Sequence, residues 1–444
     1  IIIGVDAVDW LCGRLDMFDP FGVIGLLGFH FFFLAPLLHV YWDYWMSYIT
    51  PPPDWRDWLG AMAALNVFGL IAYRFSRVWI ARNIVHQRVS IVWDLNRARF
   101  YVVVIVALLA TAALQVWVYA TQGGVWGYIQ AYVEGTGAFE GYGWIFMFSE
   151  SFPTIALFGY VVYARDKNRY KSWVAIFFVI VIFFVLKLFF GGLRGSRSNT
   201  VWGLFLAAGV IHFWIRPLPR KIVPVALVFL VVFMYIYGIY KGAGLDVIEA
   251  INDREYRAEL SYRTGRTIDV SILADLGRGD IQAFILYRML TNQGDYQYSL
   301  GRTYVGAVSL LIPRSLWPDR PPTKVKEGTE AQYGAGSYIP GIWSSSRVYG
   351  LAGETMLNFS PLAVPVAFAL FGLIVGCIRG YLTSWYPMDI RRLVFPLLVN
   401  FCFVILVGDS DNVLFFLIKN GSVPFMILYI SSVRINYQKC VNLN

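Results

Sequence analysis

Long uncharged runs of apolar residues recur along the chain. The segments 173–186, 225–240 and 393–408 contain no charged residue. Runs of close to 20 apolar residues match a hydrocarbon core of roughly 30 Å, whereas barrel strands would show about ten residues of alternation. These runs are apolar on all sides, so they predict membrane-spanning helices. The ten predicted spans are 21–40, 58–73, 100–120, 144–164, 172–190, 201–215, 222–240, 362–378, 393–408 and 413–430.

Composition agrees with this pattern. Of the 444 residues, 58% are hydrophobic and 15% are charged, against about half and about a quarter in an average globular chain. The 16 Trp and 28 Tyr suit two membrane–water interfaces. We therefore predict an all-α polytopic membrane protein and exclude a water-soluble fold. The opening IIIGVDAVDW resembles no signal peptide, so we expect the natural chain to begin upstream, where further spans would add to the ten.

Charge alternates between successive connections. Because basic loops face the cytoplasm, this alternation predicts the orientation of the spans and explains the net charge of +9 better than nucleic-acid binding. The basic connections contain Arg74, Arg77, Arg82, Arg88, Arg97, Arg99, Arg165, Lys167, Arg169, Lys171, Arg216, Arg220, Lys221, Arg379, Arg391 and Arg392, and the tail adds Arg434 and Lys439. The opposite connections contain Asp43, Asp54, Asp57, Glu134, Glu140, Asp409 and Asp411.

One connection is far too long for a simple link between spans. It divides the chain into N-terminal spans at 1–240, an extracytoplasmic loop at 241–352 and C-terminal spans at 353–444. Within the loop, 246–290 has a helical rhythm with mixed charges and predicts amphipathic helices over the bundle. The stretch 301–350 is rich in Gly, Pro, Ser and aromatic residues, so we expect an ordered irregular loop there.

A short outward connection, 191–199, breaks the charge pattern because it contains Arg194 and Arg197. Two guanidiniums among glycines can approach an anion closely, and arginine suits bidentate phosphate contacts. Lys187 lies seven residues before Arg194 and would share its face if the helix continued. The alternative is that these cations only reach towards lipid headgroups.

The proline-rich segment 312–324 contains three cations, Arg314, Arg320 and Lys324. Proline restricts its own backbone and that of the preceding residue, so these side chains would lose little freedom on binding a ligand. A rigid structural loop with solvated charges explains the segment equally well.

Glu354 and Asn358 lie just before the eighth predicted span. Four residues apart on a helix, they would share one face. A carboxylate at the bilayer surface is costly unless it is used or paired. Glu354 is thus either a general base towards a sugar hydroxyl or a structural partner of Arg347 or Arg197.

Metal and nucleotide chemistry finds no support. All four histidines (His30, His39, His86 and His212) fall in predicted spans or cytoplasmic connections. The four cysteines (Cys12, Cys377, Cys402 and Cys440) have no metal-ligand spacing, and the long loop has no nucleotide-binding motif. We expect no cofactor and no metal.

Several motifs resemble those of bacterial O-antigen and oligosaccharide repeat-unit polymerases, the Wzy-type membrane glycosyltransferases. The resemblance covers most of the chain, in the order MFDPF (17–21), GSRS (195–198), IPRSLWPDRP (312–321), GETMLNF (353–359) and FGLIVG (371–376). The related O-antigen ligases share the architecture but have a histidine in the long loop. This loop has none, which favours a polymerase.

The resemblance implies a GT-C-like helical bundle in the bacterial inner membrane, with the long loop in the periplasm. A sugar hydroxyl of one lipid-linked repeat unit would attack a glycan carried on undecaprenyl pyrophosphate, without metal. Arg197, Arg194 and Arg314 would stabilise the departing pyrophosphate, and Glu354 would accept the proton. The carry-over is looser for Lys324, Arg302 and Arg347. Membrane lipid and a chain-length regulator are further expected partners.

Two other classes of protein stay open. A transporter or flippase of lipid-linked oligosaccharides would also have many spans, but would show broken helices and charges at mid-membrane. A non-enzymatic scaffold of a polysaccharide export complex would not require the outward arginines.

Overall fold

The computed structural model describes residues 2–46, 49–83, 91–134, 139, 141–194, 197–264, 269–292, 295–312, 316–340, 342, 344–345 and 347–436. These residues form two compact units, each built from separate stretches of the chain. Unit 1 comprises Ile1–His86, Ile268–Tyr381 and Phe401–Phe416, and unit 2 comprises Gln87–Thr267, Leu382–Asn400 and Leu417–Asn444. The long loop is therefore shared between the units, with its first part in unit 2 and the rest in unit 1.

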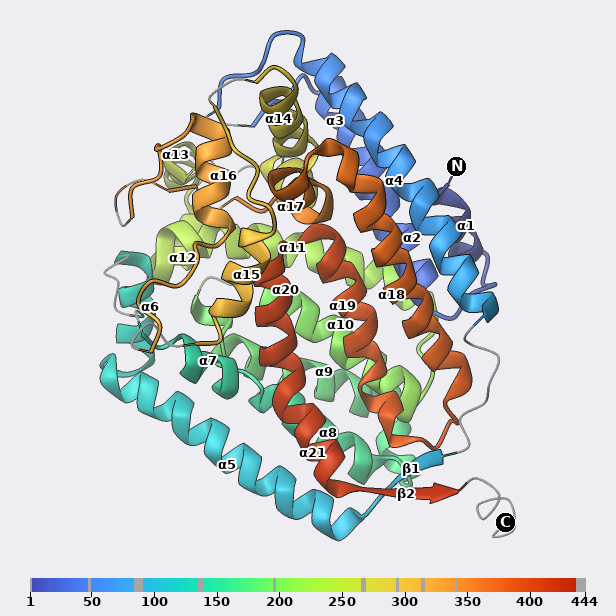
Figure 1. Ribbon diagram of the computed structural model, residues 1–444. Coiled ribbons are helices and arrows are strands. Elements are labelled where there is room, and N and C mark those ends of the chain that lie inside the picture. Colours follow the sequence, from blue (N-terminus) through green and yellow to red (C-terminus); the bar gives the residue numbers. More distant parts are fainter. Residues whose placement is uncertain are drawn as a thin grey trace. The chain divides into compact units, whose positions relative to one another are not determined.

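The chain is an all-α membrane protein in its main features (Figure 1). Seven helical segments are long and apolar enough to cross a bilayer: Pro20–Tyr41, Trp55–Asn83, Arg97–Thr121, Gly143–Ala164, Ile222–Asn252, Pro361–Ser384 and Ser410–Ser431. Two shorter apolar helices are α9 (Trp173–Phe189) and α19 (Phe395–Val407). The remaining predicted span, 201–215, lies in helix α10 (Arg197–Trp214), which is not among the seven.

Unit 1 contains the first, second and eighth predicted spans and the later part of the long loop. Its α-helices are α1 (Gly4–Leu11), α2 (Pro20–Phe29), α3 (Ala35–Tyr41), α4 (Trp55–Asn83), α14 (Gly279–Leu290), α15 (Arg302–Ser309), α16 (Lys324–Tyr333), α17 (Gly350–Phe359) and most of α18 (Val364–Ser384). Helices α19 and α20 (Ser410–Leu417) pass from one unit to the other. A π-helical segment, His30–Leu34, makes α2 and α3 one continuous rod.

Helices α4 and α18 pack at very short range. A Cβ atom on Gly372 would lie 2.4 Å from the Tyr73 carbonyl oxygen, and one on Gly376 would lie 3.0 Å from that of Arg77. Small residues at a spacing of four let membrane helices approach this closely. Two arginines expected in cytoplasmic connections lie inside these helices: Arg77 pairs with Asp6 at 2.7 Å, and Arg379 pairs with Asp19 at 2.9 Å.

Unit 2 contains a helical layer and the only two strands of the described residues. Its helices are α5 (Arg97–Thr121), α6 (Gly124–Glu134), α7 (Gly143–Ser149), α8 (Phe152–Ala164), α9, α10, α11 (Ile222–Ala243), α12 (Val247–Asn252), α13 (Arg254–Thr264) and α21 (Val423–Ser431). Helix α5 packs against α7, α8 and α21. Strand β1 (Ile91–Leu95) pairs antiparallel with β2 (Ser432–Asn436), as Figure 1 shows, with Trp93 opposite Arg434.

The long loop is more regular than its composition suggested. Helices α12, α13 and α14 occupy much of its first half, as predicted. The second half, predicted to be irregular, contains α15 and α16. The prediction was wrong at α16. Pro321 and Pro322 precede this helix and do not interrupt it, and the sequence KVKEGTEAQY at 324–333 favours helix.

Candidate functional site

Four residues singled out in the sequence, Arg302, Lys324, Glu354 and Asn358, come together in unit 1. Glu354 lies on α17 and is 3% exposed. Its Oε1 atom accepts hydrogen bonds from Thr303 Oγ1 (2.7 Å) and Ser410 Oγ (2.5 Å), and its Oε2 atom accepts one from the Ser410 backbone N–H (2.6 Å). Both carboxylate oxygens of Glu354 are thus hydrogen-bonded, to Thr303 and Ser410.

Asn358 shares the face of Glu354, as the spacing predicted. Its Nδ2 atom donates to Thr303 Oγ1 at 2.7 Å, and its Oδ1 atom accepts from the Gly301 N–H at 3.0 Å. Thr303 therefore links the two side chains. The arrangement fixes the start of α15 to α17.

Lys324 does not face solvent. This first residue of α16 is buried and pairs with Asp409, and its Nζ atom lies 3.5 Å from Asp411 Oδ1. The other carboxylate oxygen of Asp409 accepts the backbone N–H groups of Tyr349 (2.9 Å) and Gly350 (2.8 Å). We call Thr303, Lys324, Glu354, Asn358, Asp409, Ser410 and Asp411 the unit 1 cluster.

Burial and neighbouring charge decide the protonation of this cluster. Burial first, and then the charge of Asp409, raise the pKa of Glu354 to about 7, although the bonds from Ser410 and Thr303 oppose the shift. Burial likewise raises the pKa of Asp409 against the influence of Lys324. For Lys324, burial acts to lower the pKa, but Asp409 and Asp411 outweigh it and the pKa is raised. A carboxyl group that titrates near neutrality suits general acid–base chemistry.

Arg302 lies at the edge of this cluster. Its guanidinium is 3.3 Å from Glu327 Oε1, and it is the exposed partner of the pair, with 57% of its side chain accessible against 2% for Glu327. Ser299 Oγ also donates to Glu327, at 2.7 Å. The exposed guanidinium can therefore meet a ligand while the buried carboxylate keeps a donor.

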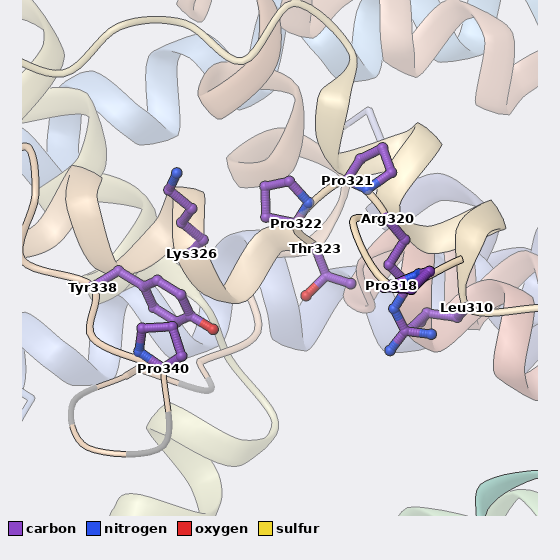
Figure 2. Close-up of a pocket in the computed structure, with 9 residues that line it drawn as sticks. All are labelled: Leu310, Pro318, Arg320, Pro321, Pro322, Thr323, Lys326, Tyr338 and Pro340. Carbon is purple, nitrogen blue, oxygen red and sulfur yellow. The ribbon is translucent and has the colours of Figure 1, made fainter. Parts of the chain in front are cut away.

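Arg320 lines a cavity of about 480 Å³ beside the start of α16. The cavity is bounded by Leu310, Pro318, Arg320, Pro321, Pro322, Thr323, Lys326, Tyr338 and Pro340. Figure 2 shows the Tyr338 hydroxyl directed towards Thr323, and the Lys326 amino group pointing away from both. The lining is rigid and partly apolar, with a few polar groups, which is typical of small-molecule sites.

A second buried cluster lies in unit 2. Glu150 is completely buried, and its carboxylate pairs with Arg194 (2.5 Å) and Lys419 and accepts from Asn199 Nδ2 (2.8 Å). Lys187 Nζ donates to the Glu150 carbonyl oxygen and to Asn199 Oδ1, both at 3.4 Å. We call Glu150, Lys187, Arg194, Asn199 and Lys419 the unit 2 cluster.

Breaks in the helices make the unit 2 cluster possible. Glu150 lies in the turn between α7 and α8, and Lys419 lies in a π-helical segment, Ile418–Ser422. Ser151 Oγ donates at 2.7 Å to the Lys419 carbonyl. The helix does not continue from Lys187 to Arg194: α9 ends at Phe189, and Gly191 has φ +116°. The two cations meet through this turn, because a Cβ on Gly191 would lie 2.3 Å from Glu150 Oε2.

The other predicted site residues are placed as follows. Arg197 is half-buried and begins α10 in unit 2, and Arg347 is half-buried ahead of α17 in unit 1. Arg314 lies outside the described residues. The structure thus brings Arg302, Lys324, Glu354 and Asn358 together in one unit and Arg194 and Lys187 in the other.

Sequence reasoning missed several members of both clusters. Asp409 and Asp411 were used only to orient the spans, and Thr303 and Ser410 carried no signal. Glu150 and Lys419 did carry one, because each is a charge inside a predicted span, and such charges are rare and functional. Among the residues that the structure describes, no group of three or more His, Cys, Asp or Glu is arranged to hold a metal ion.

Comparison with known proteins adds no identity. No protein-family model, curated protein or solved structure matches the chain.

Proposed function

We propose that this chain is a membrane glycosyltransferase that joins lipid-linked oligosaccharide repeat units into a polymer. One observation carries the proposal: the first turn of α16 borders both an acid–base cluster and a cavity. Lys324 reaches into the unit 1 cluster, while Thr323 and Lys326, its neighbours along the chain, line the cavity. An acceptor glycan in that cavity would lie on the other side of one helical turn from Glu354.

The proposed reaction needs a base and a stabilised leaving group. A hydroxyl oxygen of the acceptor attacks the anomeric carbon of a glycan on undecaprenyl pyrophosphate, and its proton passes to Glu354. The bond from that carbon to the pyrophosphate oxygen breaks, and the lipid pyrophosphate leaves with the electron pair. The exposed Arg302 and the half-buried Arg320 would stabilise the charge that develops on it. Glu354 must be ionised to act, and a pKa of about 7 leaves it so above neutral pH.

We further propose ten crossings of the bacterial inner membrane, with the long loop in the periplasm. The paired strands β1 and β2 support this count. Because hydrogen-bonded strands lie on the same side of a membrane, an even number of crossings must separate them. Five of the candidate spans and the two shorter apolar helices lie between the strands. These are seven crossings, so α10 is needed as the eighth crossing to make the number even. Both strands flank basic segments, which favours the cytoplasm.

The test is extension of a purified lipid-linked repeat unit by the full chain in proteoliposomes. We expect a polymer ladder from the native protein, its loss in Glu354→Gln, and shorter products in Arg320→Ala. Arg56→Ala is the matched control, because Arg56 forms an exposed pair with Asp43 in the same unit. A native protein that yields no ladder from a cognate repeat unit would refute the proposal, and transfer to a different acceptor would indicate a ligase.

A transporter of lipid-linked oligosaccharides is the second candidate, and the unit 2 cluster favours it. Buried charges at broken helices within apolar spans were the features expected of that class. Flipping of a fluorescent lipid-linked oligosaccharide across proteoliposomes tests this function. Flipping by the native protein that is lost in Lys419→Met, with no polymer ladder from the same preparation, would establish transport instead.

A further inference from the structure

Asp409 occupies the short connection between α19 and α20 and is fully engaged by its neighbours. One carboxylate oxygen accepts the N–H groups of Tyr349 (2.9 Å) and Gly350 (2.8 Å), and the other pairs with Lys324. Three separate stretches of unit 1 therefore meet at one side chain: the start of α16, the start of α17 and the start of α20.

The residue that follows Asp409 makes the link to Glu354. Ser410 donates both its backbone N–H and its hydroxyl to the Glu354 carboxylate, at 2.6 and 2.5 Å. Gly350, which Asp409 holds, begins the same helix that carries Glu354. Because Gly350 has φ +70°, other residues would strain this turn. Asp409 thus fixes both the helix that carries Glu354 and the donor that binds it.

We propose that Asp409 is a positioning residue that orients Glu354 for proton transfer through Ser410 and the Tyr349–Gly350 turn, in partnership with Lys324. The inference rests on the proposed function for its catalytic meaning, but its structural and electrostatic content can be measured without substrate. It adds a residue that contacts neither the cavity nor the proposed base directly.

The charges around Glu354 predict that its pKa shifts in opposite directions when Asp409 or Lys324 is replaced. The charge of Asp409 raises the pKa of Glu354, whereas Lys324 and Glu354 attract each other. The other titratable or charged groups on the helices around α17 are Arg302 and Tyr304 of α15, Lys326, Glu327, Glu330 and Tyr333 of α16, Asp280, Tyr287 and Arg288 of α14, and Asp411 of α20. Helix α14 also contributes Gln282, which donates to the Tyr349 carbonyl.

Infrared titration of the full chain in detergent measures the protonated carboxyl band of Glu354, identified as the band absent from Glu354→Gln. In Asp409→Asn we expect its midpoint to fall by about one pH unit, because a like charge is lost and Lys324 is left for Glu354. In Lys324→Met we expect it to rise by about the same amount. Asp409→Glu, which keeps the charge, should stay close to the native midpoint.

A Glu354 midpoint that falls in Asp409→Asn and rises in Lys324→Met supports the inference. A midpoint that stays in place, or that moves in the same direction in both variants, overturns it. A purely structural role would lower folded yield in all variants without separating their midpoints. If Asp409→Asn does not fold, Lys324→Met decides, and a midpoint that does not rise in that variant overturns the inference. Asp166→Asn, in the exposed Arg97–Asp166 pair of unit 2, controls for the loss of one charge.

The pH profile of polymer extension separates the two proposals. If the native protein extends repeat units with a rising limb near pH 7, that limb should move with the infrared midpoint in each variant. Infrared shifts of opposite sign without any extension would preserve the role of Asp409 and refute the polymerase. If the pH profile of extension does not move with the infrared midpoint in the variants, the polymerase proposal stands. Asp409 is then refuted as a residue that positions its base.

Discussion

The two buried clusters have inverse charge. In unit 1, the carboxyls Glu354, Asp409 and Asp411 surround one amine, Lys324; in unit 2, Lys187, Arg194 and Lys419 surround one carboxylate, Glu150. An excess of carboxyl groups favours retention of a proton, and an excess of cations favours an anion. The first cluster therefore suits proton transfer. The second suits either binding of a phosphate-bearing ligand or a structural ion-pair network that joins the broken helices.

Removing the single carboxylate of unit 2 should have the largest effect. Glu150→Gln leaves the buried Lys419 and the half-buried Arg194 without their counter-charge, which costs about 3–5 kcal/mol. The measurement is thermal unfolding in detergent, monitored by tryptophan fluorescence. Asp166→Asn breaks an exposed pair instead and should cost less than about 1 kcal/mol. Similar losses in the two variants would contradict a tightly coupled unit 2 cluster.

A smaller effect comes from pH in unit 1. With its pKa raised from 4.5 to about 7, Glu354 holds a proton in the folded protein that the unfolded chain has released. The free energy of unfolding should therefore fall by about 3 kcal/mol as pH rises from about 4.5 to above 7. The amine of Lys324, with a raised pKa, does not titrate in this window. Asp409, whose pKa burial also raises, contributes a fall of the same sign. Glu354→Gln should therefore reduce the slope between pH 5 and pH 8, and an unchanged slope would assign it to another group.

The two clusters also differ in the strength of the hydrogen bonds that serine hydroxyls donate within them. Ser410→Ala removes a hydrogen bond to a carboxylate and should cost about 2 kcal/mol, whereas Ser151→Ala removes one to the Lys419 carbonyl and should cost about 1 kcal/mol. Chemical denaturation of the two variants beside native protein gives the difference. A reversed order would place the stronger polar network in unit 2.

The smallest expected change is in Arg302→Ala. Its guanidinium is exposed, and Ser299 still donates to Glu327 when it is removed. We expect a loss of less than about 1 kcal/mol in unfolding, but a raised KM for the lipid-linked donor in the extension assay. An unchanged KM would restrict the anion site to other residues.

The membrane helices could be predicted because lipid imposes a long apolar run on every span. The clusters could not, because their contacts join residues far apart in the chain: Thr303, Glu354 and Ser410 meet only when the loop packs against the ends of α17 and α20. The spacing of Glu354 and Asn358 did predict their shared face. The spacing of Lys187 and Arg194 indicated a shared face only if the helix continued, and it is a turn at Gly191 that brings them to Glu150.

The pairing of β1 with β2 has a consequence for biogenesis. Strand β1 precedes α5, and β2 is the last element of the described chain, so a ribosome delivers the first strand long before its partner exists. Every helix between them must be inserted before the ladder can close. A polypeptide released before Ser432 would present Ile91–Leu95 as an open edge, which is a template for aggregation. Closure of this small sheet therefore comes after synthesis of every helix from α5 to α21.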